Sequence, residues 1–278
     1  AATGEALTLG RMAVGALGIL AILAMTGRLP QLRVRLSRSV VLGGLFLGLS
    51  LSTYLSATVL TDLSRAVVLH YLGPVLSTVL ARVVLKERIS PADALSLGIS
   101  FLGMLLAAGL LGGESTASTR HDSLGTILGV SSGILYGVAL LCYRFRSDMP
   151  ADARSFWNFT FGSVATAGMV LVVRPDLSGM TATNWAWAGA LFLISGLLAL
   201  GMLVVAGKHL RAAELSGLSF TEVVVATSVG ALLFAEPFSV PVALGIALIV
   251  VAAVVPLISG SRRSRQVTTS GTRVSAAG

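Results

Sequence analysis

Nine long apolar stretches constrain the fold of this chain more than any other feature. Each is about twenty residues long, the length that a helix needs to cross the hydrocarbon core of a membrane. Backbone groups in lipid must be hydrogen-bonded within their own segment, so we expect each stretch to be a helix. Only 12% of the 278 residues are charged, and a soluble chain of this size would lack the polar surface to cover its core. The sequence therefore predicts an all-α, polytopic membrane helical bundle, with spans at about 7–27, 39–60, 64–85, 92–112, 122–143, 155–174, 185–207, 213–235 and 240–259.

The basic residues predict the orientation of these spans. Cytoplasmic loops hold an excess of Lys and Arg, and sixteen of the 20 basic residues fall on one side of the predicted topology. The other side holds Arg11, Arg65, Arg120 and Arg174. We therefore expect a multi-pass protein of the cell (cytoplasmic) membrane with a cytoplasmic C-terminus. The net charge of +8 follows from this bias, so it does not indicate binding to nucleic acid.

An internal repeat relates the two halves of the chain. The third and eighth spans run in opposite directions, so the halves are copies of inverted topology. Secondary transporters have this organisation, and their substrate site lies between the repeats. A constant offset of 149 residues joins three pairs of similar positions: Tyr71 with Phe220, Glu87 with Glu236, and Ser90 with Ser239.

The repeat divides the chain into four parts. We predict a first repeat at 1–112, a linker at 113–121, a second repeat at 122–260 and a basic cytoplasmic tail at 261–278. Inverted copies need an odd number of helices each; the second copy has five predicted spans and the first has four. We therefore expect ten spans in the intact protein, the additional one preceding residue 7.

Two stretches resemble a known family. The sequence LSTVLARVVLKERIS (76–90), which follows HYLGP, resembles the end of an EamA-type repeat of the drug/metabolite transporter superfamily. The sequence EVVVATSVGALLFAEPFS (222–239) resembles the same element of the second repeat, although Val223 stands where the family usually has proline. The resemblance implies a secondary transporter, and an exporter in particular, of small organic metabolites such as amino acids or drugs, which works by alternating access.

Ionisable and polar residues inside the spans are the candidate substrate contacts, because such residues are costly in lipid. Glu222 lies inside the eighth span, where a carboxyl could bind a proton or a cationic group; an acid that only joins two helices is the alternative. His70 and Tyr71 precede Pro74, which leaves the carbonyl group of residue 70 without its helical partner. A histidine bonded to a neighbouring helix is the alternative there. The cavity candidates are completed by Tyr54 and Tyr136.

Other polar features predict structure. Glu87 and Glu236 close short turns, where we expect them to bond backbone amides of the next helix or to pair with arginine. The segment 129–133 fits the G-x-S-x-G pattern of hydrolases but lies within a span, where it lacks the strand–turn–helix context of that motif. Instead, a glycine at every fourth position predicts close helix contact, at Gly125, Gly129, Gly133 and Gly137.

The sequence has neither a P-loop nor the spacing of a metal site, and Cys142 is its single cysteine. We therefore expect no catalysis, metal or cofactor, and proton coupling stays open. The expected partners are a small-molecule solute and membrane lipid, and a homodimer stays open. Two rival functions are a membrane-embedded enzyme, which would need clustered polar groups at one interface, and a non-transporting membrane scaffold.

Overall fold

The computed structural model describes residues 4–61, 63–87, 89–107, 120–145, 149–199 and 239–252, with isolated positions between 202 and 232. These residues form helices and their connections and contain no strand, which confirms the predicted all-α class. Among them, six helices are long and apolar enough to cross a membrane, and two shorter apolar helices lie at Ala94–Ala107 and Val240–Ala252. The predicted span 213–235 lies mostly outside the described residues, as do the linker and the basic tail.

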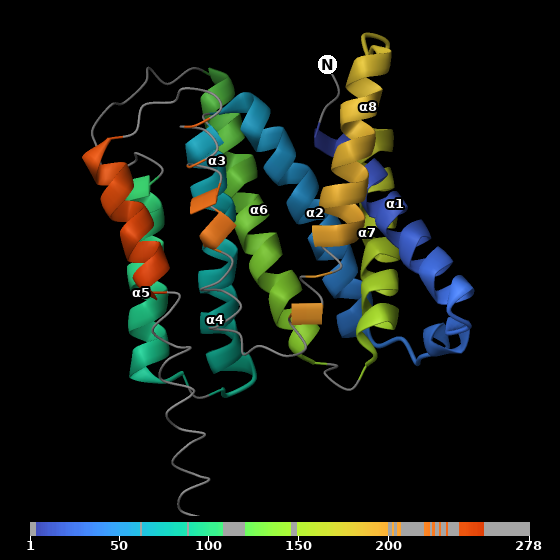
Figure 1. Ribbon diagram of the computed structural model, residues 1–278, viewed down its shortest axis with the longest axis horizontal. Coiled ribbons are helices and arrows are strands. Elements are labelled where there is room, and N and C mark those ends of the chain that lie inside the picture. Colours follow the sequence, from blue (N-terminus) through green and yellow to red (C-terminus); the bar gives the residue numbers. More distant parts are fainter. Residues whose placement is uncertain are drawn as a thin grey trace, which may run out of the picture. The chain divides into compact units, whose positions relative to one another are not determined.

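The chain forms two compact units, each of which takes segments from both halves of the sequence. The first unit comprises Ala1–Glu87 and Ser115–Arg211, and the second comprises Arg88–Glu114 and Ala212–Gly278. Helix α2 is central to the first unit, since it contacts α1, α3, α6 and α7 (Figure 1). The elements of this unit are α1 (Gly4–Met25), the 3-10 turn η1 (Leu29–Leu32), α2 (Arg38–Leu60), α3 (Leu63–His70), α4 (Leu72–Val84), α6 (Arg120–Arg144), α7 (Ala151–Val173), α8 (Ala182–Leu191) and the π-helix η2 (Phe192–Ala199).

The second unit pairs α5 (Pro91–Ala107) with the helix at Val240–Ala252. The Ser96 hydroxyl donates to the carbonyl of Ala252 at 2.6 Å, and a β-carbon at Gly245 would lie 2.5 Å from the carbonyl oxygen of Gly103. An offset of 149 residues carries Ser96 to Gly245 and Gly103 to Ala252, so each contact is the counterpart of the other. The two helices therefore pack about a local two-fold axis, as the inverted repeat predicts.

The first unit shows the same exchange of contacts, which relates α1 to α7 and α2 to η2. Gly44 of α2 packs against Asn158 of α7, and Phe192 of η2 packs against Gly10 of α1. An offset of 148 residues carries position 44 to 192 and position 10 to 158, so these two contacts are also counterparts. Helix α2 thus packs on α7 as η2 packs on α1. The inverted repeat predicted from sequence is confirmed by these exchanged contacts.

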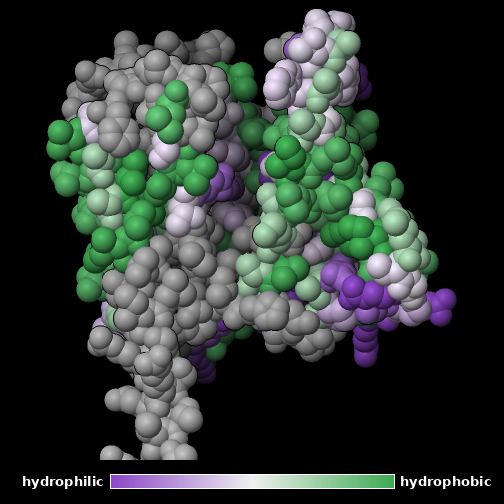
Figure 2. Space-filling view, viewed as in Figure 1, coloured by the Kyte–Doolittle hydropathy of each residue, from purple (hydrophilic) through white to green (hydrophobic). Residues whose placement is uncertain are grey.

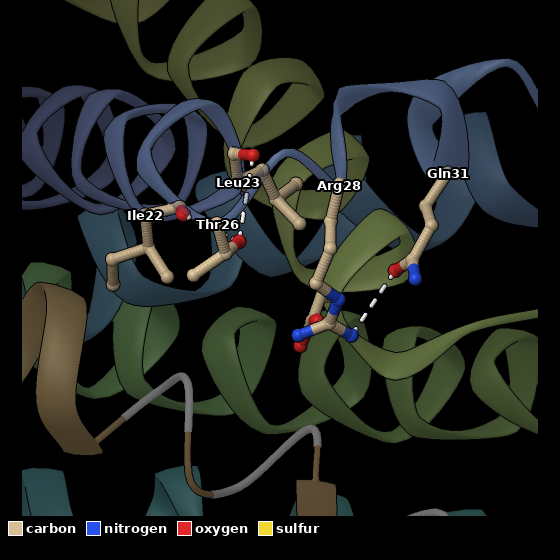
Figure 3. Close-up of polar contacts among 6 residues, drawn as sticks. Ile22, Leu23, Thr26, Arg28 and Gln31 are labelled. Carbon is tan, nitrogen blue, oxygen red and sulfur yellow. Dashed lines mark hydrogen bonds and ion pairs between the residues drawn. The ribbon is translucent and has the colours of Figure 1, made fainter.

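The end of α1 is closed by a glycine turn. Gly27 has a φ of 68°, a left-handed conformation that suits glycine, and the Arg28 amide donates to the carbonyl of Leu23 at 2.8 Å, as in a Schellman C-cap. Figure 3 shows the Thr26 hydroxyl turned back onto the last turn of the helix and Arg28 donating to Gln31. Arg28 also forms an ion pair with Asp152 at 2.5 Å, which holds the end of α1 beside the start of α7.

The outward faces of these helices are apolar. Figure 2 shows hydrophobic residues over the helices and hydrophilic residues gathered at the connection between α1 and α2. A soluble protein rarely exposes so much contiguous apolar surface, whereas lipid solvates it. The exposed apolar side chains of α1, α7 and α8 include Leu17, Ile22, Val164, Leu171, Val172 and Trp187.

Candidate functional site

His70 lies at the centre of an aromatic cluster in the first unit. Its ring stacks on Tyr54 of α2, with ring centroids 4.4 Å apart, and on Tyr136 of α6, with centroids 4.6 Å apart. Tyr71 meets the His70 ring edge-on at 5.8 Å. The structure therefore brings together four of the predicted cavity residues, and His70, Tyr71 and Tyr136 are all buried.

A pair of serines ties this cluster to the middle of the bundle. The Ser50 hydroxyl donates to the carbonyl of Ser132, and the Ser132 hydroxyl donates to the carbonyl of Ser50, each at 2.9 Å. Both side chains are fully buried, and each serine is the thirteenth residue of its helix. This reciprocal pairing joins α2 to α6 close to the midpoint of both helices.

The Ser132 hydroxyl links the serine pair to His70. His70 Nδ1 lies 2.6 Å from the Ser132 hydroxyl oxygen. When the single Ser132 hydrogen is donated to the Ser50 carbonyl, the Nδ1–H group of His70 is the donor in this contact. In the neutral ring, Nε2 is then the nitrogen that accepts a hydrogen bond or a proton.

Glycines on α6 allow α3 to approach closely enough for these contacts. A β-carbon at Gly133 would collide with the carbonyl oxygen of Leu69, the residue before His70. Gly129 packs against the Leu69 side chain, and a β-carbon at Gly137 would lie 3.0 Å from the carbonyl oxygen of Gly73. The glycine spacing noted in the sequence therefore marks the face of α6 that receives α3 and α4.

Pro74 contributes through the backbone. Helix α3 ends at His70 and α4 begins at Leu72, so the helix is interrupted at Tyr71 and Pro74 is the third residue of α4. The proline ring lacks an N–H group and crowds the carbonyl four residues earlier, that of His70. At the end of this short helix, the His70 ring lies between Tyr54 of α2 and Tyr136 of α6.

The remaining predicted residues lie elsewhere. Glu222 belongs to the second unit and is exposed there, so its role stays a prediction. Glu87 accepts from Arg144 Nε at 2.6 Å, an ion pair that joins the end of α4 to the end of α6. Glu236 lies outside the described residues.

Sequence reasoning missed a second polar cluster, on the other side of α2. Glu5, which sequence analysis would treat as a charge at the edge of the first span, is buried, and its Oε1 accepts from the Ser56 hydroxyl at 2.6 Å. Thr8 follows Glu5 by three residues on α1, and Ser52 precedes Ser56 by four residues on α2. Both are fully buried. The available signal was an acid and a threonine three residues apart on one face of an apolar helix.

Comparisons with known proteins agree with this architecture. The model of the EamA-like transporter family matches residues 3–109 and 123–258. A solved structure titled "Crystal structure of protein" has a TM-score of 0.77 over 94% of this chain and 90% of that chain, at 20% identity, which shows a shared fold. No curated protein matches the sequence. Two matched repeats that cover most of the chain, with contacts exchanged between them, place this protein in the EamA-like transporter family, a membrane transporter family of the drug/metabolite transporter superfamily.

Proposed function

We propose that this protein is a secondary transporter that exports a small organic solute, such as an amino acid or a drug, across the cytoplasmic membrane by alternating access. The observation that carries the proposal is the pair of exchanged contacts in each unit, Ser96 with Ala252 and Gly103 with Gly245 in the second. Two copies related by such a two-fold axis can exchange their conformations, which gives states open to opposite faces and is the structural basis of alternating access.

The aromatic cluster around His70 is the proposed solute contact. It combines apolar ring faces with tyrosine hydroxyls and an imidazole, the mixture typical of sites that bind small organic molecules. The adjoining serine pair lies at the middle of α2 and α6, the depth at which transporters of inverted topology bind substrate. We therefore assign Tyr54, His70, Tyr71 and Tyr136 to the solute pathway.

Flux through reconstituted vesicles tests this function. Purified protein in vesicles should release a loaded amino acid or cationic drug faster than vesicles without protein. Tyr136→Ala, which removes one side of the stack on His70, should abolish that flux, whereas Val164→Ala, at an exposed apolar position of α7, should retain it. Absence of flux for every solute in such a panel would contradict the transport function.

Glu222 is the proposed proton-coupling residue of the second unit. A carboxylate that binds and releases a proton during transport should make flux depend on pH. We expect Glu222→Gln to remove this pH dependence while leaving the amount of folded protein unchanged. An identical pH profile in the variant would exclude the role.

The proposed orientation places the basic connections in the cytoplasm. The ion pairs Arg28–Asp152 and Glu87–Arg144 gather the ends of α1, α4 and α6 with the start of α7. Cys142 is the single cysteine, so Cys142→Ser provides a background for labelling. A cysteine at position 33 should then be protected from an impermeant reagent in intact cells, and one at position 183 should be labelled.

The rival enzyme function has one feature to consider, the contact between Ser132 and His70. In a nucleophilic pair the histidine accepts the hydroxyl proton. Here the Ser132 hydroxyl also bonds the carbonyl of Ser50, so the histidine competes with a backbone acceptor for its single hydrogen. The geometry therefore favours a binding cluster over a catalytic one.

A further inference from the structure

The start of α1 contacts the end of α2 closely because the residue at the contact is a glycine. A β-carbon at Gly4 would collide with the backbone amide of Ser56, so the first turn of α1 lies directly on α2. This approach places the Glu5 carboxylate against the Ser56 hydroxyl, with 2.6 Å between the two oxygens. The acid is 94% buried, because only 6% of its surface is exposed.

Two further hydroxyl groups belong to the same patch. Helices α1 and α2 follow each other in the chain and run antiparallel (Figure 1). From the Glu5–Ser56 contact, Thr8 lies about 4.5 Å further along α1 and Ser52 lies about 6 Å back along α2, at 1.5 Å per residue. The antiparallel register therefore sets Thr8 across from Ser52, and both residues are fully buried.

The polar atoms of this patch have unused bonding capacity. Within the described part of the chain, Glu5 Oε2, Thr8 Oγ1 and Ser52 Oγ are buried without a hydrogen-bond partner. Most buried polar groups in proteins are paired, so three unpaired oxygens in one patch need an explanation. Thr8 is unusual among the threonines of these helices, since Thr53, Thr58 and Thr166 donate to carbonyls of their own helix.

We propose that Glu5, Thr8, Ser52 and Ser56 form a binding site for one compact monovalent cation, either an alkali metal ion or a primary ammonium group. Every ligand that the patch offers is oxygen, which hard cations prefer and which accepts the N–H bonds of an ammonium. The patch offers a single carboxylate, so a divalent ion would add a larger uncompensated charge to the bundle than a monovalent one.

The position of the site fits exchange with water at one membrane face. Glu5 is the second residue of α1, and Ser56 lies five residues from Thr61, where α2 has ended. A small opening of the helix ends therefore exposes the patch without unfolding the bundle. Arg11 is also buried on α1, about 9 Å further along the helix axis. Its positive charge weakens cation binding, so we expect saturation in the millimolar range.

Thermal unfolding of the purified full chain in detergent tests the site without requiring transport. Sodium, potassium and methylammonium chlorides are compared with choline chloride at equal ionic strength, because choline is too large for the patch. Binding to the folded state raises the midpoint of unfolding with saturation, by about 2 °C or more. Stabilisation by sodium or potassium identifies an alkali ion, and stabilisation by methylammonium alone identifies an ammonium group.

Variants assign any such effect to this patch. Thr8→Val and Ser52→Ala remove hydroxyls that bond nothing in the described chain, so they should fold and lose the cation-dependent shift; Glu5→Gln should lose it as well. Thr78→Val is the matched control, since Thr78 of α4 is also buried but donates to the carbonyl of Pro74 at 3.0 Å, and it should retain the shift. The proposal is overturned if all four salts give the same midpoint, or if the shift persists in Thr8→Val and Ser52→Ala.

Discussion

Helix α2 carries two buried polar clusters on opposite sides. Ser50 faces α6, and Ser52, about 200° further around the helix at 3.6 residues per turn, faces α1. In the first cluster, Ser50, Ser132 and His70 are joined by a network of hydrogen bonds. In the second, Ser52 and Thr8 are equally buried but bond nothing in the described chain.

Buried polar groups in a membrane bundle can thus have two roles, which are to stabilise helix packing and to bind a ligand. A paired network stabilises one arrangement of helices, because each polar group would be costly if it lost its partner. Unpaired groups contribute little to that arrangement, and they remain able to bond a ligand. The α2–α6 cluster is thus expected to resist change, and the α1–α2 cluster is expected to tolerate it.

The largest expected effect comes from separating the paired cluster. In Gly133→Val the new side chain collides with the carbonyl of Leu69 and displaces His70 from Ser132. We expect a loss of about 3 kcal/mol in the free energy of unfolding. Gly168→Val is the control, since nothing lies within 4 Å of a β-carbon there. Equal stability of the two variants in detergent unfolding would show that the close contact is unimportant.

A matched pair of serine variants tests the comparison directly. Ser132→Ala removes a donor to Ser50 and the acceptor of His70, and should lower the free energy of unfolding by about 2 kcal/mol. Ser52→Ala removes a hydroxyl of equal burial that has no such bonds, and should not lower it, because a buried hydroxyl without a partner is itself costly. Similar losses in chemical unfolding of both variants would remove the distinction between the clusters.

A smaller effect is expected from His70→Phe. Phenylalanine preserves stacking on Tyr54 and Tyr136 but loses the hydrogen bond to Ser132, which should cost about 1 kcal/mol. Flux in reconstituted vesicles should nevertheless fall to background, because the imidazole is proposed to contact the solute. Full flux in this variant, at unchanged protein content, would restrict His70 to a structural role.

The smallest effect is expected at the surface of the unit. The Glu87 and Arg144 side chains are 33% and 27% exposed, so water screens their ion pair. A double-mutant cycle with Glu87→Gln and Arg144→Gln should give a coupling free energy below about 1 kcal/mol. A larger coupling free energy would show that this ion pair contributes as much as a buried contact and that it helps to hold α4 against α6.

The residues of the site could be chosen from the sequence, whereas their contacts with one another required the tertiary structure. Tyr54, His70, Tyr71 and Tyr136 could be chosen from sequence because polar and aromatic residues stand out in apolar spans. Their mutual stacking could not, since it depends on which faces of α2, α3 and α6 meet. Glu5 was overlooked as a cavity residue because an acid at the edge of a span is usually hydrated.

The sequence by itself determined the helical membrane class and the inverted repeat. Span length and low charge leave few alternatives in lipid, and the offset of 149 residues is visible in the sequence. Only the tertiary structure decided which polar residues meet, as with Glu5 and Ser56, 51 residues apart, and His70 and Ser132, 62 residues apart. The physical reason is that helices in lipid choose their neighbours by close contact at small residues, and that fit depends on whole surfaces that no local pattern encodes.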